Sequence, residues 1–105
     1  MKPHQKLSPI ARQLCYLYDG VIIGSGAISD TPKDIDIIIP LDMWLQASKL
    51  IPEYAQANKF GGFKFNDSGT MVDVWTDDIM RVLVNYHDSQ IVCWSPKNNV
   101  YVKKL

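Results

Sequence analysis

The sequence predicts an α/β (α+β) fold, in which helices pack on one mixed β-sheet. The chain has 105 residues, the length of one compact domain, so we expect a single domain over 1–105. Hydrophobic residues make up 47% and charged residues 21% of the chain, which suits one buried core under a polar surface. Short β-branched runs and helical patterns follow one another along the chain, in the predicted order α-β-β-α-β-β-α-β-β.

The chain opens with a helix signal. Ser8 is a residue type favoured as an N-cap, and Pro9 suits the first helical position. Apolar side chains then recur at helical spacing as far as Tyr18, and Gly20 suits the left-handed residue that commonly follows a helix. We therefore predict a helix over 9–18.

Two strands are expected on either side of a glycine-rich turn. Residues 21–23 are β-branched and run into Gly-Ser-Gly at 24–26, which predicts a buried strand that leads into a turn. Residues 35–39 form a second apolar, β-branched run. It should end at Pro40, because proline cannot donate a hydrogen bond to a sheet.

The middle of the chain predicts a second helix. Asp42 can cap a helix whose apolar residues recur over 43–51. Pro52 should kink this helix or separate it from a turn over 53–58.

Hairpin patterns dominate the remainder. Residues 63–65 and 71–75 alternate apolar and polar side chains around Asp-Ser-Gly at 67–69, which predicts two strands joined by a tight turn. We also predict a short helix over 79–83, and a last hairpin built from 91–94 and 100–102.

Three aspartates carry the strongest chemical signal. Asp34 and Asp36 are two apart in a strand, so their carboxylates should project from the same face. Carboxylates held this close repel unless a cation neutralises them, although two solvated residues on an edge strand would show the same spacing. Asp73 lies between valines in a later strand, where a carboxylate is costly unless it faces a site. If the two strands are adjacent, the three carboxylates can bind divalent metal.

A candidate phosphate-binding turn precedes the first two aspartates. Gly24 and Ser25 follow a predicted strand, where glycine permits close backbone approach and N–H groups and a hydroxyl can bind phosphate oxygens. Lys33 adjoins Asp34, so its ammonium could touch a phosphate or pair with that carboxylate. Asp77 and Asp78 compete with Asp73 as third ligand, but they are typical of helix caps.

These motifs resemble those of the DNA polymerase beta-type nucleotidyltransferase superfamily. The family pattern is a hydrophobic residue, Gly, and Gly or Ser, then a spacer and Asp-hydrophobic-Asp-hydrophobic. The matching segments are Ile23-Gly24-Ser25 and Asp34-Ile35-Asp36-Ile37, and residues 31–36 also resemble the Thr-x-Asp-Ile-Asp pattern of minimal bacterial members. The resemblance covers residues 9 to about 76 and implies the family's mixed sheet with packed helices.

The resemblance also implies a site and a reaction. Asp34 and Asp36 would bind two metal ions, Mg²⁺ or Mn²⁺, and Asp73 would bind the catalytic one and help to activate an acceptor hydroxyl. Gly24 and Ser25 would hold the β- and γ-phosphates of a nucleoside triphosphate such as ATP. The chain would then transfer a nucleoside monophosphate to a hydroxyl on RNA, a protein or a small molecule.

The chain departs from the family pattern in two ways. The spacer between Ser25 and Asp34 is shorter than in most members, so the helix usually found there should be reduced to a turn. The sequence also ends soon after the core, without the helical domain that larger relatives use for the acceptor. A partner protein is therefore a candidate source of the acceptor site.

Two other functions fit the same motifs. The chain could be a non-catalytic nucleotide-binding or antitoxin-like regulatory module that acts with a partner chain. Clustered carboxylates alone would also suit a metal-dependent phosphatase or nuclease. A catalytic pair formed by His87-Asp88 is disfavoured, because no nucleophile motif accompanies it.

Cysteine usage and the lack of a long apolar run favour a cytoplasmic protein. Lys plus Arg and Asp plus Glu each number 11, so no net charge attracts the chain to nucleic acid or an anionic membrane. No apolar run is long enough to span a bilayer. We expect both cysteines, Cys15 and Cys93, to be reduced core thiols, with a disulfide between them as the alternative.

Overall fold

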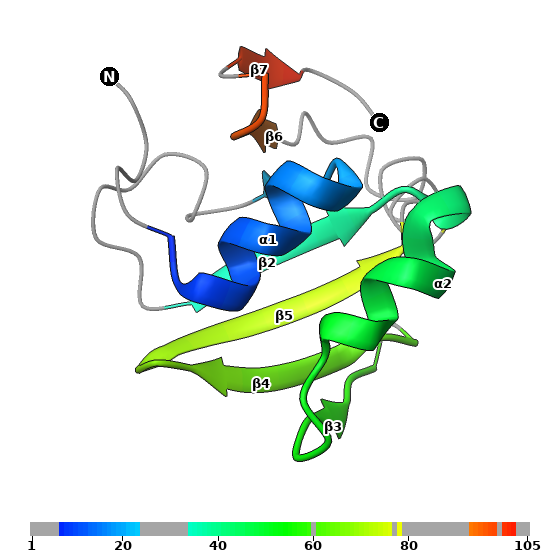
Figure 1. The fold of residues 1–105 in the computed structure, drawn as a ribbon, viewed down its shortest axis with the longest axis vertical. Helices are drawn as coiled ribbons and strands as arrows, with labels where there is room; N and C mark the ends of the chain where they lie inside the picture. The colour runs from blue at the N-terminus through cyan, green and yellow to red at the C-terminus, as the bar shows by residue number, and fades with distance from the viewer. Residues whose placement is uncertain are drawn as a thin grey trace.

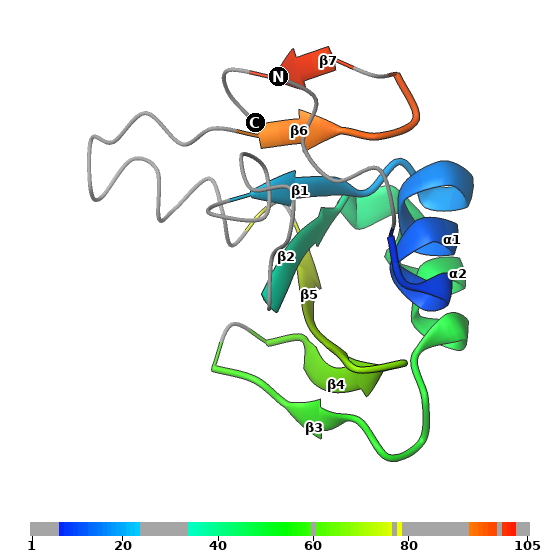
Figure 2. The same cartoon turned by 90° about the vertical axis from the view of Figure 1, so that its left-hand side faces the viewer.

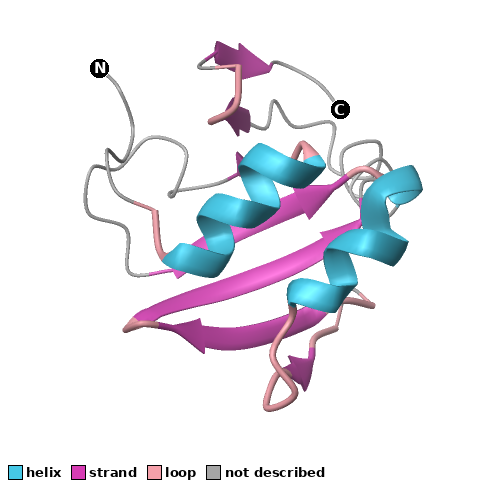
Figure 3. Ribbon diagram, in the orientation of Figure 1, coloured by secondary structure: helices cyan, strands magenta, loops and turns pink. Residues whose placement is uncertain are grey.

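The computed structural model describes residues 7–23, 34–59, 61–76, 78, 93–98 and 100–102. These residues form two layers, a twisted sheet and the helices that pack on it (Figures 1 and 3). The strands are β1 (Val21–Ile23), β2 (Asp34–Ile39), β3 (Gln56–Ala57), β4 (Phe63–Asp67), β5 (Thr70–Thr76), β6 (Cys93–Ser95) and β7 (Val100–Val102). The helices are α1 (Pro9–Tyr18), η2 (Leu41–Met43), α2 (Trp44–Ala47) and η3 (Ser48–Leu50). The predicted mixed sheet with packed helices is confirmed.

One sheet holds all seven described strands, in the order β3-β4-β5-β2-β1-β6-β7. Its two central strands, β2 and β5, run parallel, and every other neighbouring pair in the described sheet is antiparallel. Helices α1 and α2 lie side by side on the same face of the sheet (Figures 1 and 2). A parallel pair at the centre matters for function, because it brings two strands distant in sequence into contact.

The core lies between the helices and the sheet. It combines the inner side of α1 with alternate residues of the central strands, since successive strand residues point to opposite faces. Its buried side chains include Leu14, Cys15, Ile22, Ile35, Ile37, Ile39, Phe65, Val72 and Val74. The thiol of Cys15 is free and buried, and burial raises its pKa to about 12, as expected for an inert core thiol.

The three tryptophans lie in the core or pack against other side chains in the described residues. Trp75 and Trp94 are buried. Trp44 packs against the core and its ring stacks on Phe63, with ring centroids 6.3 Å apart. None of the three is presented as an open base-stacking platform.

Helix α1 has the predicted bounds, but its ends are stabilised differently from the prediction. Ser8 stands at the N-cap position without a side-chain capping bond. The cap comes from Asp67 on β4, whose Oδ2 accepts hydrogen bonds from the N–H groups of Ile10 and Ala11. At the other end the left-handed residue is Asp19, with φ 58°, and not Gly20.

Gly20 is required by packing. A Cβ atom there would lie 3.0 Å from the side chain of Ile37 and 3.1 Å from that of Ile39. The glycine lets the chain leave α1 close against the sheet. The prediction that Gly20 supplies the left-handed residue was therefore wrong.

The second predicted helix is shorter and less regular than expected. Residues 41–50 form one α-helical turn between two 3₁₀ turns, with no side-chain cap from Asp42, which lies inside the first turn. The turn predicted over 53–58 contains the short strand β3, which pairs with the beginning of β4. The sequence pattern missed this strand because it buries neither of its two residues.

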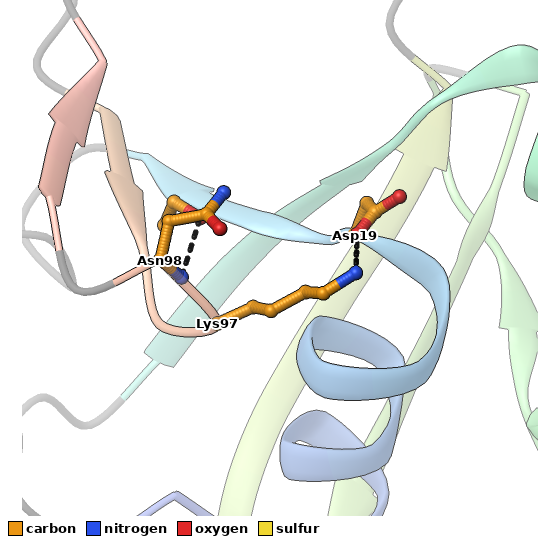
Figure 4. A network of polar contacts seen from close by, with 4 residues as sticks. Asp19, Lys97 and Asn98 are labelled. Carbon is orange, nitrogen blue, oxygen red and sulfur yellow. Dashed lines mark hydrogen bonds and ion pairs between the residues drawn. The ribbon is translucent and has the colours of Figure 1, made fainter.

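Both predicted hairpins are present. The β4–β5 turn has positive φ at Ser68 and Gly69, the type I′ geometry that matches strand twist. In the β6–β7 turn the Asn98 backbone N–H and side-chain amide donate to Ser95 Oγ, and Lys97 Nζ lies 2.7 Å from Asp19 Oδ1 (Figure 4). Both members of this ion pair are exposed, so it should contribute little stability.

Several expectations lie outside the described residues. These are the turn at 24–26, Lys33, the helix over 79–83, Asp77 and the His87-Asp88 pair. Among the helices that are described, none is long and apolar enough to cross a membrane.

Candidate carboxylate site

Asp34 and Asp36 lie on the sheet face opposite the helices. In β2, Ile35 and Ile37 belong to the core beneath α1, and the residues between them face the other way. Asp34, at the start of the strand, is exposed, and Asp36 is half-buried. Along a strand, residues two apart are separated by roughly 6.6 Å, so these carboxylates are neighbours.

Asp73 joins them from the adjacent strand. The parallel pairing of β2 and β5 sets Asp36 directly beside Asp73 in register, and Ile35 beside Val72. Val72 and Val74 are buried in the core, so Asp73 between them faces the same side as Asp36. Neighbouring strands are about 4.8 Å apart, which brings the two half-buried carboxylates within interacting range.

Electrostatic coupling follows from this placement. The pKa of Asp36 is raised from its ordinary 3.8 to about 6, first because burial disfavours the charged carboxylate. Asp73 and then Asp34 add to the rise, because each contributes negative charge nearby. The ammonium group of Lys64 opposes it. The charges of Asp34 and Asp73 are therefore close enough to affect the ionisation of Asp36.

The face that carries the carboxylates changes character along the strands. At the start of β2 Asp34 is exposed, and beside Asp73 the side chain of its register partner on β4, Lys64, is exposed as well. At the other end Ile38 and Trp75 are register partners, and both are buried although the helices lie on the opposite face. The carboxylates lie where this polar end meets the buried apolar end, an environment that strengthens electrostatic interactions.

Asn58, which the sequence did not identify, contacts the site directly. Its side-chain Nδ2 donates to Asp73 Oδ1 at 2.7 Å and lies 3.3 Å from the backbone oxygens of Phe63 and Val74. Its Oδ1 accepts the backbone N–H of Gly62 at 2.8 Å. An Asn before Gly61-Gly62 could have indicated a turn, but nothing local in the sequence points to Asp73.

The donors fit a hard divalent cation. Carboxylate oxygens are the ligands that Mg²⁺ and Mn²⁺ prefer, and a cation would relieve the repulsion that adds to burial in raising the pKa of Asp36. Within the described ranges, no three His, Cys, Asp or Glu side chains form a ready-made ligand group. The strands nevertheless bring the three carboxylates onto one face, side by side.

The other candidate residues stand apart or lie outside the described ranges. Gly24, Ser25 and Lys33 lie outside the described residues. Strand β1 ends at Ile23, which is the register partner of Asp36. The predicted phosphate turn therefore follows directly, in sequence, on a residue that lies beside Asp36. Asp67 caps α1, and Asp78 accepts a hydrogen bond from Thr76 Oγ1.

Comparison of the chain with protein-family models, with curated proteins and with solved structures finds no match. Functional inference therefore rests on the site itself.

Proposed function

We propose that the chain is a metal-dependent nucleotidyltransferase, which transfers a nucleoside monophosphate from a nucleoside triphosphate to an acceptor hydroxyl. The observation that carries the proposal is the registered pair Asp36 and Asp73 on adjacent parallel strands, with Asp34 on the same face. A strand that ends beside Asp36 and continues into Gly24-Ser25 adds a candidate phosphate-binding turn.

Each residue has a role in this proposal. Asp34 and Asp36 hold Mg²⁺ or Mn²⁺, and Asp73 completes the ligand set and orients the acceptor hydroxyl. When bound, the metal supplies charge neutralisation for the triphosphate and lowers the pKa of the hydroxyl. Gly24 and Ser25 hold the β- and γ-phosphates, and Lys33 is a further candidate for phosphate contact.

The reaction balances without any other reagent. The acceptor oxygen forms a bond to the α-phosphorus while the bond from that phosphorus to the α–β bridging oxygen breaks. Pyrophosphate leaves with the bonding electrons, and the hydroxyl proton is released to water. The acceptor could lie on RNA, a protein or a small molecule, and a partner protein could supply its binding site.

Calorimetric titration of each nucleoside triphosphate, with and without Mg²⁺, tests the site first. Wild type should bind one or more of them in a metal-dependent way, and Asp36→Asn should lose that binding. The matched control is Asp42→Asn, which removes an exposed carboxylate from the helical layer. Equal binding by wild type and Asp36→Asn would refute the assignment.

Product analysis separates the alternative functions. Release of pyrophosphate in the presence of an acceptor would support transfer. Metal-dependent binding without turnover, together with a co-purifying partner chain, would favour the non-catalytic regulatory module. Release of inorganic phosphate or cleavage of nucleic acid, without pyrophosphate, would favour a phosphatase or nuclease.

A further inference from the structure

Asn58 closes the turn between β3 and β4 and reaches the carboxylate site at the same time. The turn is closed by two hydrogen bonds: the Asn58 N–H donates to the Gly62 carbonyl oxygen at 3.0 Å, and the Gly62 N–H donates to Asn58 Oδ1 at 2.8 Å. With Oδ1 engaged by the turn, Nδ2 is directed to β5, where it donates to Asp73 Oδ1 at 2.7 Å.

The orientation of this amide is fixed by its partners. A backbone N–H can only donate, so the Asn58 atom that faces Gly62 must be the oxygen. A carboxylate and two carbonyl groups only accept, so the atom that faces Asp73, Phe63 and Val74 must be the NH₂ group. The donor to Asp73 therefore follows from the neighbouring groups.

Close packing holds the turn against β5. A Cβ atom on Gly62 would lie 1.8 Å from the Val74 carbonyl oxygen, so only glycine allows the turn to approach this closely. The half-buried Asn58 side chain consequently has little freedom to move away from Asp73.

We propose that Asn58 is a positioning residue for Asp73, which holds one carboxylate oxygen by a hydrogen bond so that the other is presented to a divalent metal. This inference rests on the proposed function, because it assigns Asp73 to metal. Outer hydrogen-bond partners orient metal ligands, and losing one typically weakens metal affinity about 10- to 100-fold.

A serine at position 58 removes the donor to Asp73. In Asn58→Ser the hydroxyl stands about where Asn58 Cγ stands, so it is too short to reach Asp73 or the Gly62 N–H, and the turn loses its side-chain bond as well. Asn58→Thr is a second variant of the same kind, in case the serine protein folds poorly.

Asn66 offers a matched control on the neighbouring turn. Its Oδ1 accepts the Gly69 N–H at 2.9 Å, so it also closes a turn through a glycine N–H, while its Nδ2 lies 3.8 Å from Met71 Sδ. Asn66→Ser therefore loosens a turn without removing a donor to Asp73.

Binding of Mn²⁺ alone, followed by electron paramagnetic resonance of the free ion on folded full-length protein, provides the test. We expect Asn58→Ser or Asn58→Thr to bind Mn²⁺ about tenfold or more weakly than wild type, and Asn66→Ser to bind like wild type. Wild-type affinity in either Asn58 variant would overturn the inference and leave the metal site standing. An equal loss in Asn66→Ser would also overturn it, and no binding by wild type would overturn the inference and the proposed function together.

Discussion

Asp67 Oδ2 accepts a hydrogen bond from the backbone N–H of Ile10 at 2.8 Å, across 57 positions of the sequence. The same oxygen accepts the Ala11 N–H at 3.1 Å. A buried carboxylate at the end of β4 thus satisfies two of the unpaired N–H groups at the start of α1. The sequence assigned this task to Ser8, whose hydroxyl makes no capping bond.

Replacing Asp67 should therefore cost far more stability than replacing Ser8. We expect Asp67→Ala to lower the free energy of unfolding by about 2–3 kcal/mol, because one buried and one part-buried N–H group lose a carboxylate partner. Ser8→Ala should change it by less than about 0.5 kcal/mol. Urea unfolding at neutral pH measures both, and a larger loss in Ser8→Ala would contradict the assignment of the cap.

Local patterns were sufficient for elements that bury one face. The helix Pro9–Tyr18 followed from apolar spacing, as did the strand Asp34–Ile39, which was expected over 35–39, and the tight turn at 67–69 followed from its residue types. They did not reveal the strand Gln56–Ala57, since both of its residues are exposed and, in the described sheet, it lies at the edge and pairs with β4 alone.

The site shows the same division between local and non-local information. The spacing of Asp34 and Asp36 showed that their carboxylates share a face. Which strand lies beside Asp36 does not follow from the local pattern, because the pairing of β2 with β5 depends on how the residues between them fold. Asn58 could not be assigned at all, since its contact with Asp73 spans 15 positions and three strands.

The two adjacent glycines at 61 and 62 should differ in their tolerance of a side chain. At Gly61 φ is +80° and a Cβ would meet nothing within 4 Å, so Gly61→Ala should cost only the left-handed strain of about 1–2 kcal/mol. At Gly62 a Cβ would meet the Val74 carbonyl oxygen at 1.8 Å, so the backbone must move. We expect Gly62→Ala to lose about 3 kcal/mol or more in urea unfolding. Equal losses would argue against close contact between this turn and β5.

The metal-free protein should lose stability as Asp36 ionises. Its folded pKa of about 6 exceeds the ordinary 3.8, so between these values the folded state binds more protons than the unfolded state. The contribution of Asp36 is therefore fully present below 3.8 and is lost as pH rises through about 6. Discounted for partial exposure, the loss should be about 1–2 kcal/mol.

Asp36→Asn isolates this contribution. The variant cannot ionise at position 36, so in chelator it should be more stable than wild type by about 1–2 kcal/mol at pH 7, with the difference shrinking toward acid. Unfolding of both proteins in urea across this pH range gives the difference directly. Asp42→Asn is the control, and it should differ from wild type by less than about 0.5 kcal/mol throughout. A difference that grows toward acid would contradict the sign of the Asp36 shift.

Divalent metal should reverse the order of stability of the same two proteins. Metal that binds only the folded state stabilises it by about 1.4 kcal/mol at ten times its dissociation constant, and by more at higher concentration. Wild type should therefore gain stability as MgCl₂ or MnCl₂ is raised, while Asp36→Asn, without a central carboxylate ligand, should gain little. Thermal unfolding in chelator and at increasing metal concentration measures both, with Asp42→Asn expected to follow wild type. If Asp36→Asn gains as much as wild type, the stabilising ion binds elsewhere on the protein. If neither gains, the raised pKa of Asp36 reflects burial and repulsion that no metal relieves, and the proposed transferase chemistry loses its metal site.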